Sequence, residues 1–280
     1  MMKSLTLRSL TIASLLSSAL FASSIDDKVL KYEKNRISSD KRIKLKDLKL
    51  NFKKDLKIDG WVGYVYDVSL NINGKDMAIK DTIFSNGKMI TAELKNLRNN
   101  MSYKRLMYPT LSYKYYDDSY LIAGNKNAKH KITIFSDPLC PNCIDVMPEI
   151  IADVQKNPNK LALYYIHMPL DMHPTARLLT KAATIAKKLG VKNVDYKLYT
   201  AEFENSFDAY AEKDEKKVLA IFNKKFKTNI TMKQINNRKL NEELEHHLKL
   251  SDDALIQGTP TVFFDGEIDP MRNKYTKYIK

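Results

Sequence analysis

The sequence has 280 residues, of which 44% are hydrophobic and 29% charged, and its formal net charge is +14 at pH 7. This length can bury a sizeable core and allows one or two domains. Two cysteines exclude a disulfide-dense scaffold and a zinc site with four cysteine ligands, and the eight glycines fit neither of the usual nucleotide-binding loops. The conspicuous feature that remains is the spacing of the two cysteines, Cys140 and Cys143.

Residues 1–24 have the pattern of a secretory signal peptide. Lys3 and Arg8 give a positive start, an apolar stretch follows, and small residues come next at 22–24. The stretch is too short and too rich in serine for a stable membrane span, and no other apolar run reaches the roughly 18 residues that a span needs. An amphipathic helix of the mature protein is the less favoured alternative. We therefore expect a soluble, exported protein.

Residues 25–57 are strongly basic. Ten lysines and arginines lie between Lys34 and Lys57, against three aspartates, and apolar residues are interleaved with them. The spacing of the apolar residues suits either a helix or an alternating strand with a slip. Such a run could contact nucleic acid or anionic lipid headgroups. A solvated face with apolar residues turned inward is favoured instead, so no nucleic-acid partner is expected.

Residues 58–122 have β-strand character. Trp61 to Val68 alternates between polar and apolar residues, and the Asn-Gly pairs at 73–74 and 86–87 predict hairpin turns. A polar break at 124–129 is the best candidate for a domain boundary. We place an N-terminal domain at 25–110, a linker at 111–128 and a second domain at 129–280.

The second domain has an α/β pattern. Short apolar stretches predict strands at 131–136, 161–168 and 261–264, and apolar spacing predicts a helix over 143–156. Residues 174–250 read as mostly helical. Asp265-Gly266 predicts a hairpin turn, followed by a short strand and a short C-terminal helix. This order indicates helices packed around a central sheet.

A CxxC pair at the start of a helix can carry out thiol–disulfide exchange. The reaction needs one thiolate of low pKa and a second thiol close enough to attack the mixed disulfide. The helix N-terminus favours an anion, so we expect Cys140 to be the nucleophile and Cys143 the resolving thiol. Pro141 suits the first turn because its missing N–H would be unpaired there anyway. Asn142 is uncharged and should not lower the pKa of Cys140.

A CxxC pair can also be half a zinc site or an inert local disulfide. Zinc would need two more ligands. None of the five histidines has a sharp spacing to the pair, and the adjacent His246 and His247 would point to different faces of a helix. We therefore expect no metal and no cofactor.

Two prolines make the CxxC pair a more specific indication of thiol–disulfide exchange. Pro148 lies five residues after Cys143, inside the predicted helix, and Pro260 follows Thr259 directly before an apolar strand. With these residues the sequence resembles the thioredoxin superfamily. The resemblance implies that Pro260 is cis and that Thr259 offers backbone groups to an extended substrate chain.

The segment from Phe135 to Cys143 and the tripeptide Gly258-Thr259-Pro260 resemble the bacterial periplasmic DsbC/DsbG family. The resemblance implies a thioredoxin-like domain with an inserted helical subdomain at about 174–250, preceded by a smaller β-rich (α+β) dimerisation domain at 25–110. It implies a periplasmic homodimer that acts as a disulfide isomerase or reductase on exported cysteine-containing proteins, with a membrane redox partner of the DsbD or DsbB type.

The sequence also departs from that family. The Pro-Asn dipeptide of the CxxC pair is not one of the usual pairs, no additional structural disulfide is present, and the C-terminal helix is short. A DsbA-like dithiol oxidase and a dimeric chaperone-type binding module therefore stay open as alternatives.

Three polar residues near the site have two interpretations each. His173 could hydrogen-bond to substrate, or it could be a structural residue at a helix start, which is favoured. Asp137 could assist proton transfer to Cys143, or it could be a turn residue. His167, on its predicted strand, is more often a core residue than a functional one.

Overall fold

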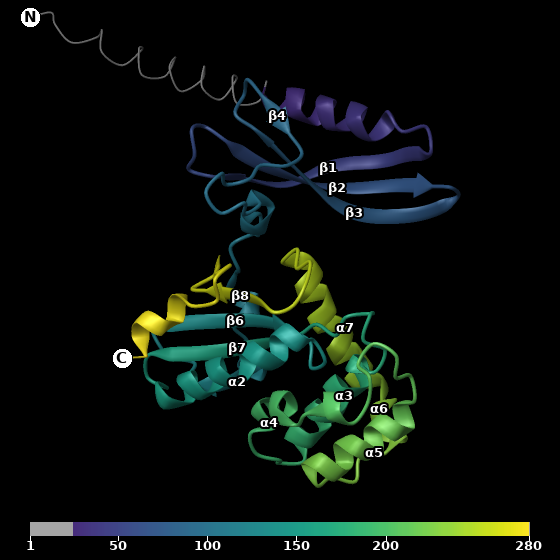
Figure 1. Cartoon of the computed structure of the whole chain (residues 1–280), viewed down its shortest axis with the longest axis vertical. Coiled ribbons are helices and arrows are strands. Elements are labelled where there is room, and N and C mark those ends of the chain that lie inside the picture. The colour runs from purple at the N-terminus through teal and green to yellow at the C-terminus, as the bar shows by residue number, and fades with distance from the viewer. Residues whose placement is uncertain (1–24, 280) are drawn as a thin grey trace, which may run out of the picture. The chain divides into compact units, whose positions relative to one another are not determined.

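The computed structural model describes residues 25–279 (Figure 1). The chain divides into two compact units between Met107 and Tyr108. The predicted signal peptide, residues 1–24, lies outside the described residues. Within the described range, no helix is long and apolar enough to cross a membrane.

The first unit is a helix on an antiparallel sheet. Residues 25–38 are helical, and strands β1 (Ile43–Asp55), β2 (Val62–Ile72), β3 (Lys75–Ser85) and β4 (Ile90–Thr91) follow in sheet order β1-β2-β3-β4. The helix packs on the sheet through Val29 and Ile37, which join a buried cluster with Tyr66, Val68 and Ile83. The sequence pattern did not predict this helix, because charged and polar residues surround its few buried positions, one of which is the polar Glu33.

Residues 43–55 of the basic run form strand β1. Its register against β2 shifts between Leu45 and Asp47 and again between Leu50 and Phe52, so the alternating strand with a slip is the correct one of the two alternatives. Several of its lysines pair with carboxylates of the same unit, as in the contact of 2.6 Å between Lys46 and Asp76. Such pairs are what a solvated face would show.

The turn predictions in this unit hold, but the β-rich region is shorter than expected. Asn73 and Gly74 both have positive φ and join β2 to β3, and Gly87, also with positive φ, lies between β3 and β4. After Thr91 the unit continues in turns and the 3-10 helix η1 (Tyr103–Leu106). Of the region 58–122, strand structure ends at Thr91 and returns only with β5 in the second unit.

The second unit is built on a five-stranded mixed sheet in the order β5-β7-β6-β8-β9. Strands β6 and β7 are parallel, and the other pairs are antiparallel. Helix α2 (Pro141–Lys156) follows β6 directly. The structure confirms the predicted α/β class, the three predicted strands and the turn at Asp265-Gly266. The strands are β5 (Leu121–Gly124), β6 (His130–Ser136), β7 (Leu161–His167), β8 (Thr261–Phe264) and β9 (Glu267–Ile268).

The predicted linker at 111–128 belongs to the second unit. It contains the 3-10 helices η2 (Tyr113–Tyr115) and η3 (Asp118–Tyr120), and β5, which pairs with β7. The polar break that suggested a boundary is the turn between β5 and β6. Gly124 has φ +79°, and a Cβ atom there would lie 2.0 Å from the carbonyl oxygen of Leu161. This glycine therefore allows close packing of two strands and does not mark a domain boundary.

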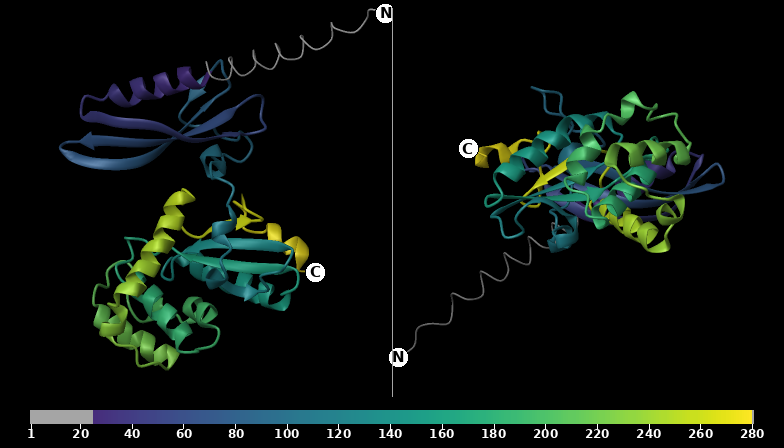
Figure 2. Two further views of the ribbon diagram at one scale, coloured as in Figure 1. Left: turned by 180° about the vertical axis from the view of Figure 1, so that it is seen from behind. Right: turned by 90° about the horizontal axis from the view of Figure 1, so that it is seen from below.

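The predicted helical insertion lies between β7 and β8, beside the sheet (Figure 2). Its helices share the core of the sheet through residues such as Leu179, Phe203 and Phe222. The C-terminal helix expected from the sequence is the 3-10 helix η5 (Lys274–Tyr278). The insertion comprises α3 (Ala176–Lys188), α4 (Val194–Thr200), η4 (Phe203–Asn205), α5 (Glu215–Phe226), α6 (Met232–Ile235) and α7 (Arg238–Asp253).

Candidate active site

The CxxC pair stands where strand β6 passes into helix α2. Cys140 is the N-cap residue, with extended backbone, and its carbonyl oxygen accepts the backbone N–H of Cys143 at 2.9 Å. Pro141 occupies the first turn and Pro148 lies inside the helix, as predicted. Both cysteines are free thiols. Cys140 is 6% exposed and Cys143 is fully buried, so only the first can meet a partner outside the fold.

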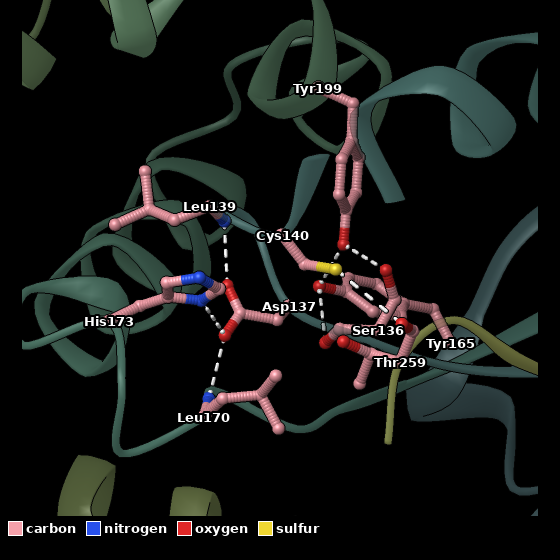
Figure 3. A network of polar contacts seen from close by, with 9 residues as sticks. All are labelled: Ser136, Asp137, Leu139, Cys140, Tyr165, Leu170, His173, Tyr199 and Thr259. Atoms are coloured by element: carbon pink, nitrogen blue, oxygen red, sulfur yellow. Dashed lines mark hydrogen bonds and ion pairs between the residues drawn. The ribbon is translucent and has the colours of Figure 1, made fainter. Parts of the chain in front are cut away.

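Thr259 and Pro260, more than a hundred residues further along the chain, lie beside Cys140. The bond between them is cis, which confirms the prediction from the resemblance. The sulfur of Cys140 lies 3.4 Å from the carbonyl oxygen of Thr259, to which it donates when it is a neutral thiol (Figure 3). Pro141 and Asn142 are exposed on the first turn of α2. The structure therefore brings the predicted site residues together at one end of the sheet, after β6 and before β8.

The surroundings of Cys140 favour its thiolate. Its pKa is lowered to about 5, chiefly by a hydrogen bond from the Cys143 thiol. Burial opposes the shift, while the Thr259 side chain and the backbone N–H of Cys143 add to it. The negative charge of Asp137 raises the pKa and is the smallest of these influences. Cys140 is thus ionised at neutral pH, as a nucleophile of this kind must be.

The surroundings of Cys143 favour its neutral thiol. Burial raises its pKa most, and its hydrogen bond to Cys140 raises it further. A hydrogen bond from the side chain of Ser136 acts in the opposite direction. The two cysteines are three residues apart and have opposite pKa shifts, because one helical turn moves the second sulfur from the edge of the fold into its core.

Asp137 is a buried anchor under the active-site turn. Its Oδ1 accepts the backbone N–H of Leu139 at 2.6 Å, and its Oδ2 accepts the backbone N–H of Leu170 at 2.7 Å. The same Oδ2 lies 2.8 Å from Nδ1 of His173, with both side chains almost fully buried (Figure 3). These contacts connect the segment before Cys140 to the loop after β7. They agree with the interpretation of Asp137 as a turn residue with a structural role.

His173 is the partner of that anchor. Its pKa is raised, first by the hydrogen bond to Asp137 and then by the charges of Asp137 and Cys140, with burial opposing the shift. Its ring contacts Tyr210 edge to face, with 4.9 Å between centroids. His173 is 2% exposed. This burial favours the structural interpretation of His173. The pairing with Asp137 was not predicted, because 36 residues and a β-strand separate the two.

Sequence reasoning also missed a set of hydroxyl groups behind Cys143. Ser136 ends β6, Tyr165 lies on β7 and Tyr199 on α4, and their side chains are hydrogen-bonded to one another (Figure 3). The tyrosines have no local motif, and only the fold brings them to Ser136. His167 is a core residue, as interpreted, and its backbone N–H donates to Nδ1 of His247 at 3.1 Å.

The described residues contain no group of three or more histidine, cysteine or acidic side chains arranged to hold a metal ion. The site that the structure assembles is therefore a dithiol at a helix start, a backbone carbonyl at a cis-proline, a buried ion pair and a buried hydroxyl chain.

Comparisons with known proteins give one family. The family model described as thioredoxin matches residues 117–279, more than half of the chain. No curated protein matches the sequence.

Solved structures similar to the chain include a thioredoxin-like oxidoreductase from Silicibacter pomeroyi, with a TM-score of 0.45 and 19% identity over 57% of this chain and 88% of that one. A periplasmic thioredoxin-like protein from Salmonella enterica has a TM-score of 0.44 and 21% identity, covering 56% and 85%. BdbD from Bacillus subtilis has a TM-score of 0.43 and 20% identity, covering 61% and 92%.

Proposed function

Because this chain belongs to the thioredoxin family, we propose that it is a thiol–disulfide oxidoreductase that works through Cys140 and Cys143. One observation carries the proposal. The two thiols of one helical turn have opposite pKa shifts, and the one with the lowered pKa lies 3.4 Å from the backbone carbonyl of Thr259, next to cis-Pro260. This is a nucleophile beside a backbone edge that can hold an extended peptide.

In the proposed reaction the Cys140 thiolate attacks one sulfur of a substrate disulfide. A mixed disulfide forms between Cys140 and the substrate, and the other substrate sulfur leaves as a thiolate. In reduction, the Cys143 thiol then loses its proton and attacks the Cys140 sulfur, which releases the substrate and leaves the protein oxidised. In isomerisation, a second substrate thiolate attacks the mixed disulfide instead, and Cys140 is regenerated.

We propose an isomerase or reductase of the DsbC/DsbG type, acting on exported cysteine-containing proteins. The resemblance of the segments around Cys140 and Pro260 supports this direction. A dithiol oxidase resembling DsbA is the second candidate, and one observation favours it. The lowered pKa of Cys140 stabilises the reduced protein, and a pair whose reduced form is stabilised is a stronger oxidant.

The proposed setting follows from the sequence. Residues 1–24 would act as a signal peptide, and the mature protein would work in the periplasm, where disulfides persist. A membrane redox partner of the DsbD or DsbB type would restore the pair after each cycle. No nucleic acid, metal or other cofactor takes part in the proposed reaction, since thiol–disulfide exchange needs only the sulfur atoms.

We also propose a homodimer formed through the first unit. Strand β4 pairs with β3 only at Phe84 and Ser85, so the rest of that edge of β3 has no strand partner among the described residues. Met77 and Ile79 on this part of β3 are 47% and 42% exposed. An unpaired edge with apolar side chains is a surface on which a second strand can add. Light scattering on wild type and Ile79→Lys tests the proposal, and a monomeric wild type would exclude it.

Enzyme assays test the oxidoreductase proposal. Wild type and Cys140→Ser are compared in the reduction of insulin, the reactivation of scrambled ribonuclease and the oxidation of reduced ribonuclease. Asp145→Ala, at an exposed position of α2, is the matched control. We expect Cys140→Ser to lose all disulfide chemistry and the control to keep it. Equal activity of Cys140→Ser and wild type would refute the proposal.

The same assays separate the alternatives. Faster reactivation of scrambled ribonuclease supports an isomerase, and faster oxidation of reduced ribonuclease supports an oxidase. If Cys140→Ser still suppresses aggregation of an unfolded protein as well as wild type does, a chaperone-type binding function accompanies the chemistry.

A further inference from the structure

A chain of three hydroxyl groups runs through the core behind the resolving thiol. The hydroxyl of Tyr199 donates to Oγ of Ser136 at 2.7 Å, and the hydroxyls of Tyr199 and Tyr165 are 2.6 Å apart (Figure 3). Ser136 in turn hydrogen-bonds to Cys143. Three elements, β6, β7 and α4, contribute one hydroxyl each. All three residues are buried, so water does not compete for these contacts.

The donors in this chain point toward the sulfur. Because Tyr199 donates to Ser136, the hydrogen of the Ser136 hydroxyl is free to point at Cys143. Tyr165 lies within reach of both the Tyr199 hydroxyl and, at 3.4 Å, the backbone carbonyl of Ser136. A hydroxyl that receives a hydrogen bond becomes a stronger donor, so each member of the chain strengthens the bond that reaches the sulfur.

The resolving step creates a need for such a chain. Cys143 must become a thiolate before it can attack, yet burial holds its pKa above the ordinary value. The charge of a Cys143 thiolate is felt by both tyrosines, because it raises the pKa of Tyr199 and of Tyr165. Burial raises both tyrosine pKa values still more, so both hydroxyls keep their protons and stay donors over the working pH range.

We propose that the Ser136–Tyr199–Tyr165 chain stabilises the Cys143 thiolate during resolution of the mixed disulfide. Ser136 contacts the reacting sulfur and is the catalytic member, while Tyr199 and Tyr165 are positioning residues that act through it. The inference rests on the proposed function, since it concerns the second step of the same reaction.

The step balances without a further reactant. The Cys143 S–H bond breaks and its sulfur forms a bond to Cys140, while the bond between Cys140 and the substrate sulfur breaks. The electron pair of that bond leaves on the substrate sulfur, which takes a proton from solvent, while the proton of Cys143 passes to solvent. The substrate sulfur is reduced, the Cys143 sulfur is oxidised, and Cys140 passes from the mixed disulfide to a disulfide with Cys143. The hydroxyl chain neither gains nor loses a proton over the cycle.

The experiment separates the two steps with one reagent. Reduced protein is mixed with an aromatic disulfide that releases a coloured thiolate at each step. Attack by Cys140 gives the first release, and resolution by Cys143 gives the second. Cys143→Ala should show only the first release, which assigns the phases. The test variants are Ser136→Ala, Tyr199→Phe and Tyr165→Phe. Tyr164→Phe, the neighbouring tyrosine on β7, is the matched control.

For Tyr199→Phe we expect the second phase to slow about tenfold and its pH profile to move to higher pH, with the first phase unchanged. Ser136→Ala should slow the second phase more, and Tyr165→Phe less. A structural disturbance alone would not move the pH profile of the second phase while leaving the first phase unchanged.

Three results would overturn the inference. One is a second phase in Tyr199→Phe that matches Tyr164→Phe. Another is an equal slowing of both phases, which would indicate a structural defect. The third is an unshifted pH profile in Tyr165→Phe, a variant that keeps the ring and leaves Ser136 in place. If wild type itself shows no first phase, the proposed function fails, and that failure is distinguishable from failure of the inference.

Discussion

The surroundings of Cys140 and those of Cys143 differ in nearly every respect, although one turn of α2 joins them. Cys140 lies at the edge of the fold, next to a backbone carbonyl and the uncharged, exposed Asn142. Cys143 lies in the core, and the only polar side chains that lower its pKa are the hydroxyls of Ser136 and Thr259. The pKa is lowered at the first sulfur and raised at the second.

The difference shows how one short motif makes two kinds of thiol. Neither sulfur owes its shift to a neighbouring positive charge in the dipeptide between them. Instead, the Cys143 thiol serves as the main donor to the Cys140 thiolate, so the shift in the pKa of Cys140 depends on Cys143 staying protonated. Four substitutions test this difference between the two thiols, at Asp137, Cys143, His173 and Thr259.

The largest effect is expected for Asp137→Ala, which removes the anchor beneath both cysteines. The variant leaves two backbone N–H groups and His173 without their buried acceptor. We expect the free energy of unfolding to fall by about 3–5 kcal/mol, as is typical when one partner of a buried pair is removed. Denaturant titration measures this, with the exposed Asp145→Ala as control. Equal stability of the two variants would contradict the anchor role.

Cys143→Ala should remove most of the lowering of the Cys140 pKa. The variant removes the strongest cause of the lowered pKa, a hydrogen bond to a charged group. Such a bond is worth about 1.5–3 kcal/mol, so we expect the Cys140 pKa to rise by about 1–2 units from its value near 5. The pH dependence of alkylation by iodoacetamide reports this pKa. An unchanged titration would mean that Cys143 does not donate to the thiolate.

His173→Gln should change how stability depends on pH. The folded-state pKa of His173 is raised above the ordinary imidazole value of about 6.5. Its stabilisation is therefore fully present below that value and is lost as the pH rises through the raised pKa. We expect wild type to exceed the variant by about 1–2 kcal/mol at acidic pH and by less at alkaline pH. A constant difference across the titration would argue against the ion pair.

The smallest effect is expected for Thr259→Val, which keeps the backbone carbonyl and removes one hydroxyl. This side chain is a lesser cause of the lowered Cys140 pKa than the Cys143 thiol. We expect the pKa to rise by about half a unit, less than in Cys143→Ala. The same alkylation titration measures it, with the half-buried Thr276→Val as control. A rise in the Cys140 pKa as large as that in Cys143→Ala would contradict the conclusion that the Cys143 thiol lowers this pKa more than Thr259 does.

The parts of the fold that local patterns encode were predictable. Strand β6, helix α2 and strand β8 have apolar runs of the right length, and the Asn-Gly and Asp-Gly turns need no tertiary information. The CxxC pair and the Thr-Pro dipeptide also stand out locally. These features were enough to place both sides of the candidate site.

The parts that depend on distant contacts were not predictable. Gly124 reads as a break, whereas its role is set by Leu161 on another strand. The helix over 25–38 buries Glu33, which forms a salt bridge of 2.6 Å to Arg36. From the sequence alone, a charged residue at this position would be assigned to the surface. Asp137 finds His173, and Ser136 finds Tyr199, only after the helical insertion has packed on the sheet.

The lowered pKa of Cys140 also links the redox state of the protein to its melting. An unfolded cysteine has a pKa of about 8.5, whereas that of Cys140 in the reduced fold is about 5. The resulting stabilisation is fully present above the ordinary value, shrinks by up to about 1.4 kcal/mol per pH unit below it, and vanishes as the pH falls through 5. The disulfide form has no thiolate and lacks this term. As the pH rises from acidic to neutral, the Tm of the reduced protein should therefore rise relative to the Tm of the oxidised protein. The free energy that stabilises the reduced protein against unfolding also favours transfer of the disulfide to a substrate.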